Sequence, residues 1–184
     1  MKELSLNILD ITENSTKAKA EFISIEIVED EDTLRITITD NGTGMTEETL
    51  SSVANPFYTT RTTRKVGMGI PLFRMAAEMT GGNLTITSKH FSEHSDAHGT
   101  TVSALLYKNH IDFTPLGDVI STVTTLIQGH PDVDFLFTHK RGDLFVSLDT
   151  RELRAVLEGV PLDTFEVLCW IKGNLEEQYL EFNK

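Results

Sequence analysis

The sequence has 184 residues, enough for one sizeable domain or for one domain with a small additional unit. Acidic residues outnumber basic ones, 28 against 16, and the formal net charge of −12 argues against a nucleic-acid-binding surface, which needs clustered Lys and Arg. The single cysteine, Cys169, excludes an internal disulfide framework. No apolar segment reaches the roughly 18 residues of a membrane span, and no signal-peptide pattern is present. We therefore expect a cytoplasmic protein with no membrane or nucleic-acid partner.

The first half of the sequence predicts alternating helices and strands. Residues 4–18 carry apolar side chains at spacings of three and four, which is typical of an amphipathic helix. Residues 22–29 and 34–39 alternate between two faces and are joined by an acidic turn, so they predict a β-hairpin. Further along we expect a glycine-rich loop at 40–44, a short helix from Thr46, a mobile loop over 55–69, a helix over 70–80, and strands at 83–89 and 100–107.

The pattern changes after Tyr107. Pro115 opens a predicted helix that runs to Gln128, and two strands and two helices are expected at 133–138, 144–148, 151–158 and 162–180. In the last of these helices Phe165, Leu168, Cys169, Trp170 and Ile171 are expected to lie in the core. Strands grouped with helices on one side predict an α+β fold, a two-layer α/β sandwich. We expect one domain over residues 1–109 and a small C-terminal α+β extension over 110–184.

Three polar residues share one face of the first predicted helix. Asp10, Asn14 and Lys17 stand at i, i+4 and i+7, close to the apolar stripe. The side-chain oxygen of Asn14 is of the kind that Mg²⁺ prefers. Asp10 could orient or deprotonate a water molecule, and Lys17 could contact a terminal phosphate. The alternative is an ordinary solvated helix face, which this triplet alone does not exclude.

Two glycine-rich segments are suited to close contact with a ligand. Asp40 precedes Gly42 and Gly44, and its carboxylate could accept a hydrogen bond from the N6 amine of adenine, while the glycines allow a sharp turn. The segment Gly67-Met68-Gly69-Ile70 opens the next helix, whose free N–H groups and dipole suit phosphate. Each segment alone is also compatible with an ordinary turn.

The loop before the second glycine segment is unusually basic for this chain. Arg61, Arg64 and Lys65 gather there, three of only sixteen bases. Such clustering in an acidic protein favours a loop that faces an anion, with a flexible solvated loop as the alternative.

Taken together, these segments resemble the GHKL ATPases, the family of histidine-kinase, gyrase, heat-shock chaperone and MutL ATP-binding domains. The resemblance covers about residues 4–107 and rests on motifs in the family's order. Residues 9–15 are similar to the N-box, Asp40 to Met45 to the first glycine box, Asn55 to Thr60 to the Pro-Phe segment of histidine kinases, Gly67 to Ile70 to the second glycine box, and Gly99 to Thr101 to the closing Gly-Thr element. The chain also resembles small stand-alone bacterial members of the family.

The resemblance implies an ATP pocket (the Bergerat fold) with a role for each matched residue. It implies Asn14 on Mg²⁺, Asp40 on adenine N6, Thr100 supporting the adenine through water, and the Gly67–Gly69 turn on the phosphates. It places Asp10 at the position of the catalytic carboxylate and Lys17 at that of a phosphate-contacting base. Hydrolysing members usually carry Glu at the position of Asp10, so the shorter side chain is a departure that leaves general-base chemistry in question.

Three functions remain open from the sequence. The first is a Mg-ATP-dependent regulatory protein, kinase-like, that acts on a protein partner. The second is an ATPase conformational switch of the MutL or chaperone type without phosphotransfer, and the third is a nucleotide sensor that does not hydrolyse ATP. The identity of the partner and the choice between monomer and homodimer also stay open.

Overall fold

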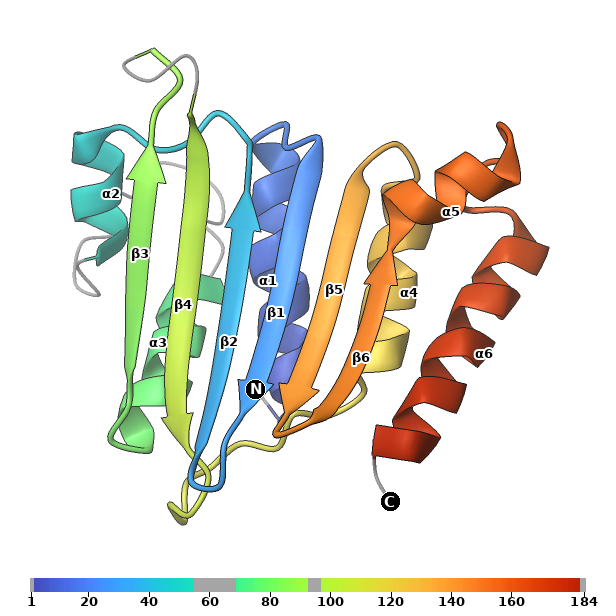
Figure 1. Ribbon diagram of the computed structural model, residues 1–184. Helices are drawn as coiled ribbons and strands as arrows, with labels where there is room; N and C mark the ends of the chain where they lie inside the picture. Colours follow the sequence, from blue (N-terminus) through green and yellow to red (C-terminus); the bar gives the residue numbers. More distant parts are fainter. Residues whose placement is uncertain (1, 55–68, 93–96, 183–184) are drawn as a thin grey trace.

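The computed structural model describes residues 2–54, 69–92 and 97–182. In this part of the chain six strands form one sheet in the order β3-β4-β2-β1-β5-β6 (Figure 1). Neighbouring strands are antiparallel, except that β1 and β5 run parallel. The elements are α1 (Leu4–Lys17), β1 (Phe22–Glu29), β2 (Thr33–Asp40), α2 (Glu47–Ala54), α3 (Gly69–Met79), β3 (Asn83–Lys89), β4 (Gly99–Tyr107), α4 (Val119–Gly129), β5 (Asp134–Arg141), β6 (Leu144–Asp149), α5 (Thr150–Leu157) and α6 (Phe165–Phe182). The predicted α+β sandwich is confirmed.

The alternation in the first hairpin sets which side of the sheet is buried. Ile23, Ile25 and Ile27 of β1 are almost fully buried, as are Leu34, Ile36 and Ile38 of β2. The antiparallel register pairs Ile25 with Ile38. Because side chains alternate between the two faces of a strand, both strands direct their branched apolar residues to one face.

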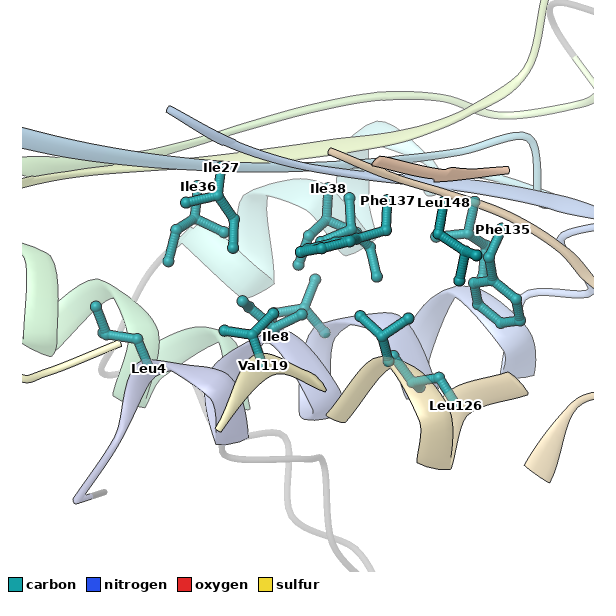
Figure 2. Packing of buried hydrophobic residues seen from close by; sticks show 14 of the residues in the cluster. Leu4, Ile8, Ile27, Ile36, Ile38, Val119, Leu126, Phe135, Phe137 and Leu148 are labelled. Atoms are coloured by element: carbon teal, nitrogen blue, oxygen red, sulfur yellow. The ribbon is translucent and has the colours of Figure 1, made fainter. Parts of the chain in front are cut away.

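Helices α1, α3 and α4 cover that face of the sheet (Figure 1). Figure 2 shows Ile8 of α1 and Val119 and Leu126 of α4 opposite Ile38, Phe137 and Leu148 of the sheet. Burying each such side chain stabilises the fold by about 1.5–3 kcal/mol. The core therefore continues from the N-terminal helix into the C-terminal part of the chain.

The C-terminal extension adds to the same sheet. Strand β5 pairs with β1 over its whole length, with Phe22 opposite Asp134 and Glu29 opposite Arg141. The Nε2 atom of His130, just after α4, lies 2.8 Å from Oε1 of Glu13 on α1. The division near residue 109 stays a prediction, and the two predicted parts are joined by continuous strand pairing.

Helix α4 begins at Val119, four residues later than the sequence predicts. The carbonyl groups of Pro115 and Leu116 instead accept hydrogen bonds from the N–H groups of Leu4 and Ser5, at 2.9 and 2.8 Å. They thus satisfy donors at the start of α1 that have no partner within that helix. Asp118 caps α4 by accepting from the Ser121 N–H at 2.8 Å.

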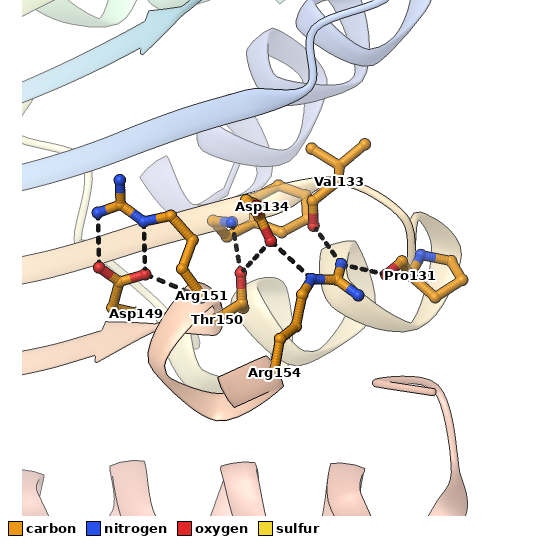
Figure 3. A network of polar contacts seen from close by, with 8 residues as sticks. Pro131, Val133, Asp134, Asp149, Thr150, Arg151 and Arg154 are labelled. Carbon is orange, nitrogen blue, oxygen red and sulfur yellow. Dashed lines mark hydrogen bonds and ion pairs between the residues drawn. The ribbon is translucent and has the colours of Figure 1, made fainter. Parts of the chain in front are cut away.

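A polar network holds α5 against the start of β5 (Figure 3). The Nε atom of Arg154 donates to Asp134 at 2.7 Å, and the Thr150 hydroxyl accepts from the Phe135 N–H at 2.8 Å. Arg151 pairs with Asp149 at 2.6 Å and lies over the Phe22 ring. These contacts fix the turn from β6 into α5.

Helix α6 lies along the edge strand β6. The side chain of Gln178 accepts from the N–H of Ser147 at 2.9 Å and donates to its carbonyl at 3.0 Å, which covers part of an edge that would otherwise face solvent. The helix buries Val167, Ile171 and Leu175. The core placement expected for Phe165, Cys169 and Trp170 is wrong, since all three are exposed. It is confirmed for Ile171, and Leu168 packs against the core while partly exposed. No helix in the described part of the chain is long and apolar enough to cross a membrane.

Candidate functional site

Asp40, at the end of β2, is the centre of a buried hydrogen-bond cluster. Its side chain accepts from the Ser15 hydroxyl at 2.6 Å through Oδ2, and from the Gly42 and Thr100 N–H groups at 2.9 and 3.2 Å through Oδ1. Only 8% of Asp40 is exposed. The three donors come from α1, from the loop after β2 and from β4. The carboxylate is held in one orientation, and Oδ2 keeps acceptor capacity for a ligand.

A second layer of contacts positions Thr100 and the loop after β2. The hydroxyl of Ser88 on β3 lies 2.8 Å from that of Thr100 and accepts from the Met45 N–H at 2.7 Å. Nδ1 of His98 lies 2.6 Å from the carbonyl oxygen of Gly42. Because Ser88 contacts both Met45 and Thr100, it links the loop after β2 to the start of β4.

The backbone conformation at position 44 explains why a glycine stands there. Its φ of +69° is a left-handed conformation that residues with a side chain rarely adopt, and a Cβ there would collide with the carbonyl of Lys89. The loop can therefore pass close to the end of β3.

Helix α3 begins against the middle of α1. A Cβ placed on Gly69 would lie 2.9 Å from the Cβ of Asp10, closer than normal packing allows. The glycine thus lets the first turn of α3 approach Asp10. Ile70, the next residue, is half-buried. The N–H groups at the start of a helix suit anionic groups, and here they lie beside a carboxylate-bearing face of α1.

The polar face of α1 is open. Asp10 and Lys17 are exposed and Asn14 is half-buried, and none of the three side chains hydrogen-bonds to another residue in the described part of the chain. Ser15 points the other way, to Asp40. Asp10 and Lys17 are thus presented to solvent, with Asp10 next to the start of α3 and Asn14 half-buried between them, while the same helix anchors the carboxylate of Asp40.

Part of the predicted site lies outside the described residues. Arg61, Arg64, Lys65, Gly67 and Met68 fall there, as do residues 55–68 of the loop predicted at 55–69, so their roles stay predictions.

The sequence did not single out three residues that the structure brings to this region. Ser15 and Ser88 donate to, or position, groups around Asp40, and only the strand and helix packing reveals this. Asn7 is the third: it is 1% exposed, and neither of its side-chain polar atoms has a partner in the described part of the chain. It stands seven residues before Asn14, on the same side of α1. The spacing of seven residues from Asn14 was a signal available from the sequence, whereas the burial of Asn7 was not.

Comparison with known proteins identifies the architecture. A family model described as the histidine kinase-, DNA gyrase B- and HSP90-like ATPase matches residues 1–110. The chain belongs to this ATPase family. Membership implies that the domain binds ATP.

Two solved structures share the fold. The MutL ATPase domain of Aquifex aeolicus, complexed with ADP, superposes with a TM-score of 0.56 at 16% identity, covering 86% of this chain and 70% of that one. The N-terminal domain of a DNA repair protein superposes with a TM-score of 0.50 at 17% identity, covering 81% of this chain and 52% of that one. The superposition with the MutL domain covers 86% of this chain, which is more than residues 1–110 make up. The similarity of fold therefore extends into the C-terminal part.

The donor set fits a magnesium ion that is carried in with the nucleotide. Mg²⁺ usually keeps several waters and phosphate oxygens and takes few protein ligands. The half-buried Asn14 supplies one amide oxygen on the polar face of α1, four residues after Asp10, which lies against the start of α3. One protein oxygen at that place is compatible with a Mg-nucleotide complex.

Proposed function

We propose that this protein is a Mg-ATP-dependent regulatory protein that acts on a protein partner in the manner of a kinase-like switch. The observation that carries the proposal is the open row Asp10, Asn14 and Lys17 on α1, next to the helix start at Gly69. A carboxylate, an amide and an amine in that place are the groups that phosphoryl transfer needs for a proton, a metal and a terminal phosphate.

Each group has a defined task in this proposal. Asp40 accepts a hydrogen bond from adenine N6 through the remaining capacity of Oδ2, and Thr100 supports the adenine through water. Asn14 holds Mg²⁺, which neutralises phosphate charge, and Lys17 contacts the terminal phosphate. Asp10 takes the proton from the attacking side chain of the partner. Arg61, Arg64, Lys65 and the Gly67–Gly69 turn contact the phosphates.

The contact of the C-terminal part with α1 supports a regulatory role. Glu13, which precedes Asn14, lies 2.8 Å from His130, and the N–H groups of Leu4 and Ser5 are held by the segment before α4. A shift of α1 on nucleotide binding would therefore be transmitted to residues 115–130. A partner bound there could sense the nucleotide state.

The second candidate is an ATPase switch without phosphotransfer, and the fold likeness to the MutL ATPase domain favours it. A non-hydrolysing sensor is the third, because Asp10 is one methylene shorter than the Glu of hydrolysing members.

Incubation of the protein with γ-labelled ATP and a cell extract separates these functions. Label on a protein, lost in the Asp10→Asn variant, supports phosphotransfer. Label released only as free phosphate supports the switch, and label that stays in ATP supports the sensor. The first outcome alone agrees with the proposal, and either of the others overturns it.

A further inference from the structure

A cavity of about 290 Å³ lies at the end of the sheet farthest from Asp40. Glu29 lines it as the last residue of β1, whereas Asp40 pairs with Ile23 at the other end of that strand. In Figure 1 this is the lower end, where the arrows of β1 and β5 point and where α6 ends. The cavity is therefore separate from the nucleotide site.

A hydrogen-bonded chain of three polar side chains, of which His139 is buried and the other two are partly exposed, forms one wall. His139, 1% exposed, has its Nε2 atom 2.9 Å from Oε1 of Glu29 and its Nδ1 atom 2.8 Å from the hydroxyl of Tyr179. Lys108 binds the other oxygen of Glu29 at 3.3 Å. Since Glu29 can only accept, Nε2 carries a proton, while Nδ1 either accepts from the Tyr179 hydroxyl or donates to its oxygen. In either arrangement the Tyr179 oxygen keeps at least one lone pair for another donor.

The positively charged side chain of Arg141 also lines the cavity, beside these three polar side chains. Arg141 is two residues from His139 on β5 and therefore faces the same side of the sheet. Its guanidinium lies 4.4 Å from the centre of the Phe182 ring and donates to the Phe182 carbonyl. A guanidinium carries five N–H donors in a planar fork that matches a carboxylate, and the bond to Phe182 uses one of them.

The remaining walls combine a carboxylate with apolar surface. Asp118 lines the cavity while Ser121 donates to both of its oxygens, at 2.8 and 2.7 Å. Leu116, Val119 and Ile120 supply apolar surface, and Phe182 closes the side formed by α6. Apolar walls with a few convergent polar groups are typical of small-molecule sites.

We propose that this cavity binds a free α-amino acid with an apolar side chain. The carboxylate of the ligand lies on the Arg141 fork, and its ammonium group is held by the Tyr179 oxygen and by the negative charges of Glu29 and Asp118. Its side chain packs on Leu116, Val119 and Ile120. A ligand with both charges matches a wall with both charges, whereas a simple anion or amine leaves one of them unmatched. The volume suits a molecule of this size.

Calorimetry and NMR on the full chain test this site with L-leucine. We expect saturable binding below about 10 mM, and binding at least about tenfold weaker for 4-methylpentanoate and for 3-methylbutylamine, which each lack one charged group. Amide shifts should concentrate at residues 117–120 and 139–141. Absence of saturable binding of L-leucine, equal binding of either analogue, or shifts centred on Asp40 and Gly42 would each overturn the proposal.

Variants locate the contact within the cavity. Arg141→Gln should weaken L-leucine binding at least about tenfold, while Lys140→Gln, the same charge change on an exposed neighbour, should leave it unchanged. Tyr179→Phe removes only a hydroxyl and should weaken binding by a smaller factor. An unfolding scan establishes that each variant is folded. Wild-type affinity in a folded Arg141→Gln or Tyr179→Phe protein, or an equal loss in Lys140→Gln, contradicts the assignment.

Discussion

Ser15 donates its hydroxyl hydrogen to Oδ2 of Asp40 at 2.6 Å, across 25 residues of sequence and between α1 and the end of β2. The same helix presents Asp10, Asn14 and Lys17 on its open side. This bond joins the helix that is proposed to hold the metal and the phosphates to the carboxylate that is proposed to bind adenine. The adenine and phosphate ends of the candidate site are therefore mechanically linked.

Asp40→Asn should weaken ATP binding by a factor of about 10 to 150, equivalent to about 1.5–3 kcal/mol, because an amide replaces the charged acceptor. Calorimetry with Mg-ATP measures this. Asp132→Asn, the same exchange at an exposed position, is the control. Unchanged affinity in Asp40→Asn would exclude the adenine assignment.

Ser15→Ala removes one donor from a carboxylate that is 8% exposed. We expect a loss of about 1–3 kcal/mol in the free energy of unfolding, since part of a buried acceptor is left unpaired. Chemical denaturation measures it. In the Asp40→Asn background the effect should be smaller, and full additivity of the two substitutions would show that the pair is not coupled.

Asp10→Asn should keep ATP binding and slow turnover by about 10²–10⁴-fold, because an amide cannot accept a proton. Asp10→Glu should keep or raise turnover, because the longer side chain reaches farther toward the attacking group. Single-turnover hydrolysis of the three proteins is the measurement. If Asp10→Asn matches a clearly active wild type, Asp10 is not the base, and Glu13 or a residue of the partner becomes the candidate.

Gly69→Ala should displace α3 from α1, since its Cβ would lie 2.9 Å from that of Asp10. A displacement of about 1 Å near reacting groups can slow a reaction by about 10²-fold, and we expect a turnover loss of that order. Gly173→Ala is the matched control, because its Cβ meets nothing within 4 Å and it lies inside α6. That control should stabilise the protein by about 0.5–1 kcal/mol. Normal turnover in Gly69→Ala would show that the close approach is dispensable.

Glu29 gives the stability a defined pH dependence. The hydrogen bond from His139, assisted by the charges of His139 and Lys108, lowers the pKa of Glu29 below its ordinary value, although burial opposes this. The folded state thus holds the charge to lower pH than the unfolded state. The resulting stabilisation is complete above the ordinary pKa and is lost as the pH falls through the lower folded pKa.

Glu29→Gln should accordingly cost about 1.5–3 kcal/mol of unfolding free energy at pH 7 and much less at pH 3. Denaturation curves at both pH values test this. A cost that is equal at the two pH values would mean that the charge of Glu29 does not stabilise the fold.

The sequence alone determined most of the local structure and the family. Alternation of Ile23, Ile25 and Ile27 against polar neighbours is a period-two signal that only a strand with one buried face produces, and β1 and β3 begin and end where predicted. The glycine segments and the N-box could be recognised because their chemistry is carried by consecutive residues. Asp10, Asn14 and Asp40 were singled out as candidate site residues in this way.

Only the tertiary structure decided which distant segments meet. The parallel pairing of β1 with β5, the bond from Ser15 to Asp40 and the His139 chain join residues far apart in sequence, and no local period encodes such partners. The observed start of α4 differs from the predicted one for the same reason, since the carbonyl groups of Pro115 and Leu116 bind the backbone of α1. Trp170 is the opposite case: its helix was predicted, but the structure exposes Trp170 and buries its neighbour Ile171. Local propensity fixes the elements, whereas burial depends on which faces the assembled core covers.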